Sequence, residues 1–233
     1  MASSWHTSSR QSHLNIIQEL LDPVGKKIID IGCGAGQITR ALTKIGAEVT
    51  GIDPGKRQLE RARAEEPVGD ETYLEGVAEN LPFDSKSIDI ALFFNSFHHV
   101  RQEGFSLAIE ESHRVLKPGG KLYFAEPIAN GPQFELSRLI NDETEIRSLA
   151  YESILTSANK GFTAISEITY ITENKHKDFD TFKINSMSIN PARDVIFQKY
   201  GQEIKEVFER IGIKNQGFYV FDNPVRGNLY ERI

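Results

Sequence analysis

Residues 28–37, IIDIGCGAGQ, constrain the fold of this chain more than any other stretch. An apolar run ends at Asp30, and three glycines follow at alternate positions: Gly32, Gly34 and Gly36. Glycine lets the backbone turn sharply and lets a ligand approach it closely, and the start of a following helix offers free N–H groups and a positive dipole end. The segment therefore predicts a strand, a ligand-binding turn and a helix in direct succession.

The spacing of these glycines separates two kinds of ligand. A dinucleotide loop requires G-x-G-x-x-G, and its third glycine would fall on Gln37. Asp30 would repel a pyrophosphate but attract an ammonium group. Asp53 ends the next predicted strand, where its carboxylate is placed to accept hydrogen bonds from ribose hydroxyls. The pattern predicts a ligand with a sugar and an amine, although a plain tight turn at the glycines and a helix start at Asp53-Pro54 are the simpler alternatives.

Strand and helix patterns alternate along most of the chain. The predicted strands are 26–32, 47–53, 71–77, 87–95, 120–127, 162–171 and 217–222. The predicted helices are 14–21, 37–46, 54–66, 105–116, one or two within 136–155, 178–189 and 195–211. Alternation with short connections implies a parallel sheet covered by helices on both faces. A ligand would then lie beyond the carboxyl ends of the strands, between the first and the fourth.

Length and charge limit the classes of partner. The 233 residues suit one domain, and the net charge is −6 without a run of Lys or Arg, which disfavours nucleic acid and anionic membranes. We see no apolar segment near the roughly 20 residues of a membrane helix and no signal-peptide pattern, so we expect a cytoplasmic protein. Cys33, the single cysteine, is predicted to serve packing. The oligomeric state does not follow from the sequence.

Four segments, VGKKIIDIGCGAG, GIDPGKRQLERAR, AENLPFDSKSIDIALFF and RVLKPGGKLYF, follow one another in a known order. Together they resemble the class I S-adenosylmethionine-dependent methyltransferases, in particular the type that includes the ubiquinone and menaquinone biosynthesis enzymes (methyltransferase type 11). The resemblance is close over residues 24–124 and extends beyond them only in general topology.

The resemblance implies an α/β fold that is Rossmann-like and doubly wound. We expect a mostly parallel seven-stranded sheet with an antiparallel last strand and a helical cap. The single domain, 1–233, would divide into an N-terminal lid and helix (1–22), a cofactor-binding core (23–130), the cap and substrate-side helices (131–215) and a final strand (216–233).

The resemblance also implies S-adenosyl-L-methionine as the cofactor. The glycines would pass under its methionine part, with Asp30 facing the ammonium group, and the Ala78 N–H would meet the adenine edge. The family often has aspartate before that alanine, but this chain has Val77, so Glu79 or Asn80 substitutes or the hydrogen bond is absent. The predicted cofactor-binding residues are Asp30, Gly32, Gly34, Gly36, Asp53, Pro54, Val77, Ala78, Glu79 and Asn95.

Methyl transfer is an in-line displacement that requires the acceptor to be held close in a site without competing water, and a protonated acceptor also needs a base. The run FFNSFHHV follows the fourth predicted strand and supplies imidazoles at this point. The predicted catalytic residues are His98, His99, Asn95 and Glu126. The alternative is that the histidines cap a helix or pack there.

Other polar residues are predicted to have lesser roles. We expect His6, His13, His113 and His176 to be solvated. We expect Asp142, Glu143, Glu145 and Arg147 to form a solvated helix face. Arg226 is either structural or near the acceptor, and the end of the chain is expected to close the sheet edge. Trp5 and His6 would fold over the bound ligands as a lid, with a disordered tail as the alternative.

Several acceptors are disfavoured by the sequence. No Asn/Asp-Pro-Pro-aromatic run follows the fourth strand, and Cys33 is misplaced for attack on a pyrimidine, which disfavours nucleic-acid substrates. No cluster has convincing metal-ligand spacing, so we predict no metal. The leading interpretation is a small-molecule methyltransferase with the acceptor atom (N, O, C or S) open. The alternatives are a module that binds S-adenosylmethionine without turnover and a nicotinamide-dependent oxidoreductase, which Gln37 and Asp30 oppose.

Overall fold

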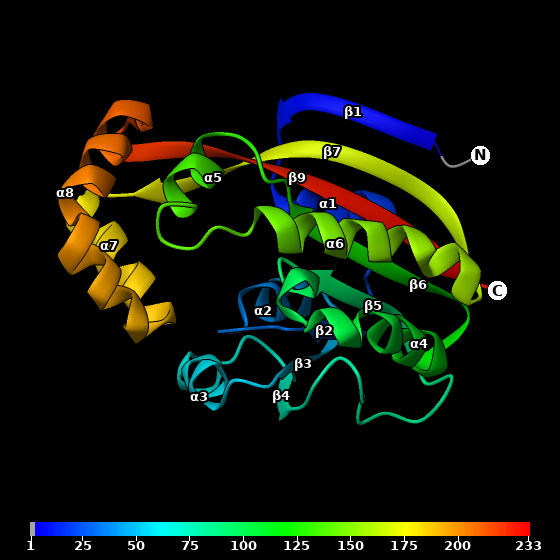
Figure 1. Ribbon diagram of the computed structural model, residues 1–233. Helices are drawn as coiled ribbons and strands as arrows, with labels where there is room; N and C mark the ends of the chain where they lie inside the picture. Colours follow the sequence, from blue (N-terminus) through cyan, green and yellow to red (C-terminus); the bar gives the residue numbers. More distant parts are fainter. Residues whose placement is uncertain (1–2) are drawn as a thin grey trace.

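The computed structural model describes residues 3–233, with backbone alone for residues 3–9. One nine-stranded sheet runs through the molecule in the order β1-β7-β9-β6-β5-β2-β3-β4, and β8 pairs with β9 (Figure 1). The strands are β1 (Ser3–Arg10), β2 (Lys27–Ile31), β3 (Glu48–Asp53), β4 (Thr72–Glu75), β5 (Ile88–Phe94), β6 (Leu116–Pro127), β7 (Phe162–His176), β8 (Ile213–Asn215) and β9 (Phe218–Arg232).

Strands β2 to β6 form the parallel part of the sheet. Strand β9 is antiparallel to both β6 and β7. The mostly parallel α/β sheet with an antiparallel last strand is therefore confirmed. Strand β2 lies beside both β5 and β3, so the order reverses between the first and fourth predicted strands, as expected for a ligand site at the carboxyl edge.

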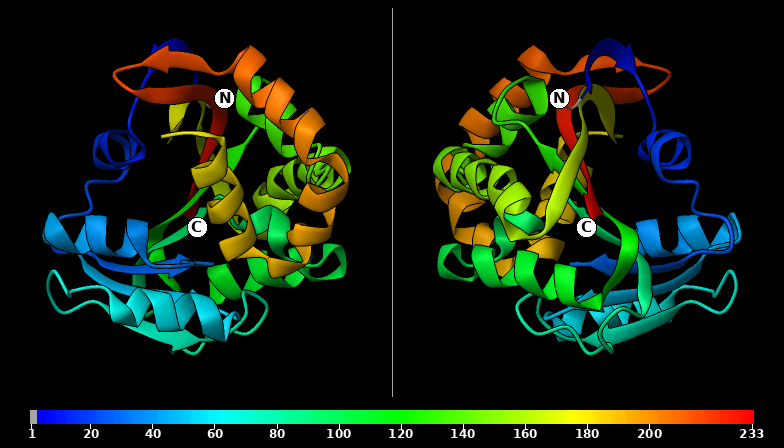
Figure 2. Two further views of the ribbon diagram at one scale, coloured as in Figure 1. Left: turned by 90° about the vertical axis from the view of Figure 1, so that its left-hand side faces the viewer. Right: turned by 90° about the vertical axis from the view of Figure 1, so that its right-hand side faces the viewer.

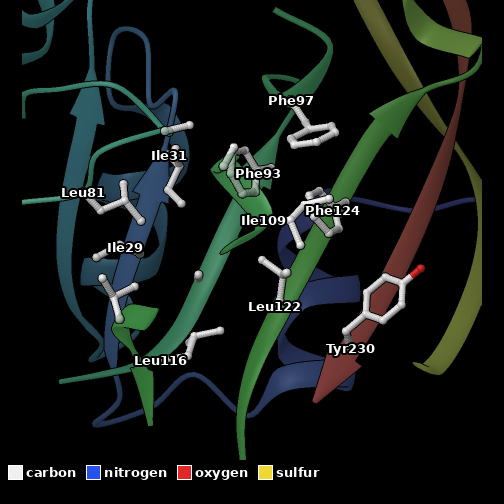
Figure 3. Packing of buried hydrophobic residues seen from close by; sticks show 14 of the residues in the cluster. Ile29, Ile31, Leu81, Phe93, Phe97, Ile109, Leu116, Leu122, Phe124 and Tyr230 are labelled. Atoms are coloured by element: carbon white, nitrogen blue, oxygen red, sulfur yellow. The ribbon is translucent and has the colours of Figure 1, made fainter. Parts of the chain in front are cut away.

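Alternate residues of each inner strand face opposite layers, because side chains in a strand point to opposite faces in turn. Ile29 and Phe93 pack with helices α4 (Phe105–Val115) and α6 (Thr144–Leu155), as Figure 3 shows for the strand side of this layer. The neighbouring Ile28 and Leu92 pack instead with α1 (His13–Leu21) and α2 (Gln37–Lys44). Figure 2 shows these two helix pairs on opposite sides of the sheet.

The remaining helices are α3 (Lys56–Ala64), α5 (Pro132–Ser137), α7 (Phe179–Ile189) and α8 (Asp194–Ile211). Helices α5, α7 and α8 share a third apolar cluster with Phe221 of β9, at the end of the molecule where β6 ends (Figure 1). This cluster forms the helical cap. Because β7 and β8 lie in the sheet, residues 131–215 combine cap helices with two sheet strands.

Two features of the fold differ from the sequence expectations, and a third expectation stays untested. The sheet has nine strands rather than seven, because β1 pairs in parallel with β7 and β8 pairs with β9. The end of the chain does not close the sheet edge: β9 lies inside the sheet, between β6 and β7. The backbone of Trp5 and His6 belongs to β1, and their side chains lie outside the described residues, so the lid stays a prediction.

The expectation that His13, His113 and His176 are solvated is wrong. The His13 ring lies edge-on to Phe94, and its Nδ1 is 2.9 Å from the Tyr170 hydroxyl. His113 accepts a hydrogen bond from Arg232, and His176 lies among the cap phenylalanines with both ring nitrogens buried. The polar residues beside each histidine in the sequence gave no sign of these contacts, most of which come from segments distant along the chain.

We predict that His13 makes folding stability depend on pH. Burial lowers the pKa of His13 from 6.5 to about 4, so between these values the unfolded chain binds more protons than the folded one. Its contribution is present above pH 6.5 and is lost as the pH falls toward 4, by at most about 1.4 kcal/mol per pH unit.

Thermal melting of the wild-type protein and of His13→Gln at pH 7 and pH 5 measures this. The variant should lose less stability on acidification than the wild-type protein. An equal loss in both proteins would assign the acid sensitivity to the other buried histidines.

Candidate active site

The glycine loop follows β2 in the conformation that its sequence requires. Gly32, Gly34 and Gly36 have φ values of 78°, 54° and 77°, which side-chain-bearing residues rarely adopt. A Cβ on Gly32 would lie 2.4 Å from the Ser96 side chain, and one on Gly36 would lie 2.5 Å from the Tyr73 hydroxyl. A Cβ on Gly34 would meet no protein atom within 4 Å. The middle glycine therefore faces open space, while its two neighbours secure the loop.

Asp53 fastens this loop to the end of β3. Its Oδ2 accepts a hydrogen bond from the Gly34 N–H at 2.9 Å, and its Oδ1 accepts from the Gly55 N–H at 2.7 Å. Each carboxylate oxygen has a second lone pair, so Asp53 retains capacity for hydroxyl donors. The carboxylate thus lies directly against the backbone of Gly34.

Asp30 lies beneath the loop, where only 1 % of the residue is exposed. Its Oδ2 accepts a hydrogen bond from the Thr39 hydroxyl at 2.7 Å. Burial raises the pKa of Asp30 to about 6, with the Thr39 bonds opposing the rise and the charge of Asp53 adding to it. Direct contact between Asp30 and an ammonium group stays a prediction, because the observed residue is almost fully buried.

The segment after β4 contains the residues that the sequence predicts to lie beside adenine. Ala78 is 6 % exposed, whereas the apolar side chain of Val77 is 43 % exposed. The side chain of Glu79 extends toward Gly104, close enough that a Cβ there would lie 2.5 Å from its Oε1. Of the two residues considered as substitutes for the missing aspartate, Glu79 is therefore turned toward the start of α4. Cys33 is buried, and burial raises the pKa of its thiol, in keeping with a packing role.

The segment after β5 is held by Glu126, at the end of β6. Its Oε1 accepts hydrogen bonds from the backbone N–H groups of Ser96 and Phe97 at 3.0 and 2.8 Å, and its Oε2 is hydrogen-bonded to His98 Nδ1. Asn95 directly precedes the residues that Glu126 holds. Its φ is 53°, and its N–H donates a hydrogen bond to the carbonyl oxygen of Ala125. Glu126 contacts both backbone and imidazole, which fixes the place of the histidines.

The two histidines occupy different environments. The His98 side chain is 1 % exposed and lies between two carboxylates, with its Nε2 3.7 Å from Glu143 Oε2. His99 has an exposed edge, and its ring centroid is 4.0 Å from that of His98. Desolvation of the His99 ring, together with the nearby His98, lowers its pKa, so the ring is neutral at pH 7.

The expectation of a solvated face at the start of α6 is wrong for two of its four residues. Glu143 accepts hydrogen bonds from Arg147 at 2.6 and 3.1 Å, and their side chains are 14 % and 12 % exposed. Burial opposes ionisation of Glu143, but His98, Arg147 and His99 outweigh it and lower its pKa. Asp142 and Glu145 are exposed, as expected. Spacing along α6 could not reveal that one turn packs on the histidine segment.

His98, His99 and Glu143 place ligand-type atoms within 4.8 Å of one another, a candidate set for a metal ion. The Glu143 oxygen that faces His98 also accepts from Arg147 at 2.6 Å. A cation at this point would face the guanidinium group at short range, which raises the electrostatic cost of binding. The arrangement is better suited to holding protons than to holding a metal.

A cavity of about 320 Å³ opens beside Glu126. Helix α6 lies in front of β6 and β9 at this place, as Figure 1 shows. The cavity is lined by Glu126, Pro127, Ile128, Ala129, Thr144, Arg147, Ser148, Tyr151, Ile154, Arg226 and Asn228. Arg226 has one of its two expected positions here, near the proposed acceptor site. Tyr151 and Asn228 belong to no sequence motif, so their presence in the lining could not be predicted.

Comparison with known proteins gives the class of the domain. Residues 29–124 match the methyltransferase domain family. A ubiquinone biosynthesis O-methyltransferase of Proteus mirabilis is 35 % identical over 119 residues, covering 48 % of this chain and 46 % of the relative. A demethylmenaquinone methyltransferase of Chlorobaculum tepidum is 39 % identical over 104 residues, covering 44 % and 41 %. The chain spans about half the length of the curated relatives it matches.

Solved structures resemble the chain over nearly its whole length. The YcgJ protein of Bacillus subtilis has a TM-score of 0.62 at 22 % identity, covering 94 % of this chain and 97 % of that one. A putative methyltransferase of Bacillus halodurans has a TM-score of 0.61 at 17 % identity, covering 95 % and 99 %. At these identities the likeness concerns the fold alone.

The glycine loop, the strand order and the family match together support a class I S-adenosylmethionine-dependent methyltransferase domain at residues 29–124. The relatives that match this region include ubiquinone and menaquinone biosynthesis methyltransferases, and the family match supports S-adenosyl-L-methionine as the cofactor. Among the described residues, no helix is both long and apolar enough to cross a membrane.

We predict that Asp53→Ala weakens cofactor binding by about 1–3 kcal/mol, since hydrogen bonds to a charged acceptor are lost. The variant also frees the Gly34 N–H, so a lower melting temperature should accompany the loss. Asp53→Asn keeps one acceptor oxygen and should lose less. Calorimetric titration with S-adenosylhomocysteine measures the effect, with the exposed Asp70→Ala as a control. Unchanged affinity in Asp53→Ala would remove Asp53 from the cofactor site.

Proposed function

We propose that the protein transfers the methyl group of S-adenosyl-L-methionine to a small-molecule acceptor by in-line displacement. The observation that carries this proposal is the open space at Gly34, whose N–H donates to the Asp53 carboxylate, together with the cavity beside Glu126. Gly32 contacts Ser96, and Ser96 is held by Glu126, so one continuous set of contacts leads from the loop to the cavity. A donor site and an acceptor site would adjoin along these contacts.

The residues of the open loop fit the cofactor. When bound, it supplies an electrophilic methyl group on a sulfonium centre. In our proposal, the backbone at Gly34 lies against the methionine part, and the free lone pairs of Asp53 accept hydrogen bonds from the ribose hydroxyls. The exposed side chain of Val77 offers apolar surface to adenine beside Ala78. Asp30 adds a negative charge beneath the loop whenever it is ionised.

The histidine pair supplies the proton acceptor in this proposal. His98 is covered on both sides by carboxylates, so we assign it a positioning role, held by Glu126 at Nδ1. His99 has the exposed edge and a lowered pKa, which keeps it unprotonated at neutral pH. We therefore propose His99 as the base that receives the acceptor's proton, with Asn95 at the mouth of the site.

A small molecule suits the size and charge of the site better than a polymer. A cavity of about 320 Å³ falls within the range of small-ligand pockets. The net charge of −6 opposes association with nucleic acid. The two relatives named above carry quinone-pathway names, which supports a small acceptor without identifying it.

A screen of fractionated metabolite pools for transfer of a labelled methyl group tests the proposal. We expect one or a few labelled small molecules, and tight binding of S-adenosylhomocysteine with no response to NAD. Binding of S-adenosylhomocysteine without any labelled product would favour a module that binds the cofactor without turnover. Tight binding of NAD in its place would favour the oxidoreductase.

We predict that His99→Ala lowers turnover of a protonated acceptor roughly 10²–10⁴-fold, because a well-placed base contributes about that much. Cofactor affinity should stay within a few-fold, since the base acts on the acceptor. Activity requires neutral His99, so wild-type turnover should fall as the pH drops through its lowered pKa, and the variant should lose this acid limb.

The matched comparison is His98→Asn, which keeps a polar side chain beside Glu126. Because His98 is assigned a positioning role, its replacement should lower turnover but leave the acid limb of the pH profile in place. Near-normal turnover with an intact pH profile in both single variants and in the double variant would mean that proximity alone drives the transfer.

A further inference from the structure

The charged groups around the cavity are matched to partners with one exception. Arg147 forms a double hydrogen bond with Glu143, and Glu126 accepts two backbone hydrogen bonds and is bonded to His98. These charges are already satisfied within the protein. They therefore give a ligand in the cavity little electrostatic selectivity.

Arg226 is the exception. Its side chain is 26 % exposed, and its Nε is buried and has no hydrogen-bond partner in the described part of the chain. The nearest carboxylate, Glu167, has Oε1 3.9 Å from this nitrogen, beyond hydrogen-bond distance. The other oxygen of Glu167 accepts from Asn228 at 2.8 Å and from the Tyr151 hydroxyl at 3.0 Å. Glu167 thus orients the neighbours of Arg226 and leaves the guanidinium incompletely paired.

The position of the guanidinium suits it to a planar anion. Arg226 Cζ lies 3.7 Å from the centroid of the Tyr151 ring, so the group is stacked on an aromatic face. Both residues line the cavity, as does Asn228. A stacked guanidinium retains its in-plane N–H donors, which match the two oxygens of a carboxylate. Across the sheet, Arg226 is the register partner of Glu126, which places this donor group beside the residue that holds His98.

We propose that the cavity holds the methyl acceptor by a carboxylate group, which Arg226 binds while Tyr151 covers its apolar body. This inference rests on the proposed function and specifies the substrate class: a small organic acid with a planar or aromatic body. The proton-accepting histidine pair and the carboxylate anchor lie on opposite sides of Glu126. The acceptor atom would therefore be separate from the anchored carboxylate.

Binding of benzoate and of its neutral counterpart benzamide tests the proposal without requiring turnover. Calorimetry or ligand-observed NMR on the whole protein should show benzoate binding at millimolar concentrations and at least tenfold weaker binding of benzamide. Arg226→Gln should reduce this preference to less than twofold while binding of S-adenosylhomocysteine stays unchanged. Arg61→Gln, on exposed α3 surface, removes the same charge and should leave the preference intact.

Arg226→Lys is the control for a folding defect in Arg226→Gln. It keeps the positive charge but removes the planar set of N–H donors. It should weaken benzoate binding at least fivefold with a melting temperature close to that of the wild-type protein. Equal binding of benzoate and benzamide, no benzoate binding at millimolar concentrations, or an unaltered preference in Arg226→Gln would overturn the proposal. Inorganic phosphate binding as tightly as benzoate would also overturn it, by indicating a site for a free anion. If the wild-type protein does not bind S-adenosylhomocysteine, the proposed function itself is refuted.

Discussion

The carboxylate of Glu126 is the interaction on which the candidate site depends. It joins the end of β6 to the segment after β5 through two backbone N–H groups and one imidazole. Hydrogen bonds to a charged group are stronger than neutral ones, at about 1.5–3 kcal/mol each. Phe97 is buried against Phe93 and Phe124 (Figure 3). This packing and the hydrogen bonds of Glu126 together fix the position and orientation of His98 and His99. The donor loop depends on the same hydrogen bonds, because Ser96 lies directly against Gly32.

The parallel half of the fold could be predicted from the sequence because its signals are local. A short, mostly apolar run such as residues 88–94 favours a buried strand, and glycines at alternate positions favour a tight turn. The same locality placed Asp53 at the end of β3 and the histidines after β5. The sequence could not predict β1, because Ser3–Arg10 is polar and is ordered by pairing along β7.

The remaining parts of the site arise from long-range packing. Glu143 and Arg147 have the pattern of a solvated helix face, and only the docking of α6 on the histidine segment turns them inward. Tyr151 and Arg226 lie far apart in sequence and meet because β9 inserts between β6 and β7. The solvated interpretation of His13 and His176 failed for the same reason. A side chain's neighbours along the chain say little about the neighbours that tertiary contacts bring to it.

The insertion of β9 between β6 and β7 also has a consequence for how the chain is synthesised. Lys121 of β6 pairs with Glu231 of β9 across 110 residues of sequence, so β6 and β7 leave the ribosome long before the strand that joins them. Until β9 arrives, each has an unpaired edge, and contacts of such separation form slowly. Arg226 and Asn228 arrive with that strand. A nascent chain can therefore assemble the glycine loop early, while the cavity beside Glu126 is completed only after β9 has been synthesised.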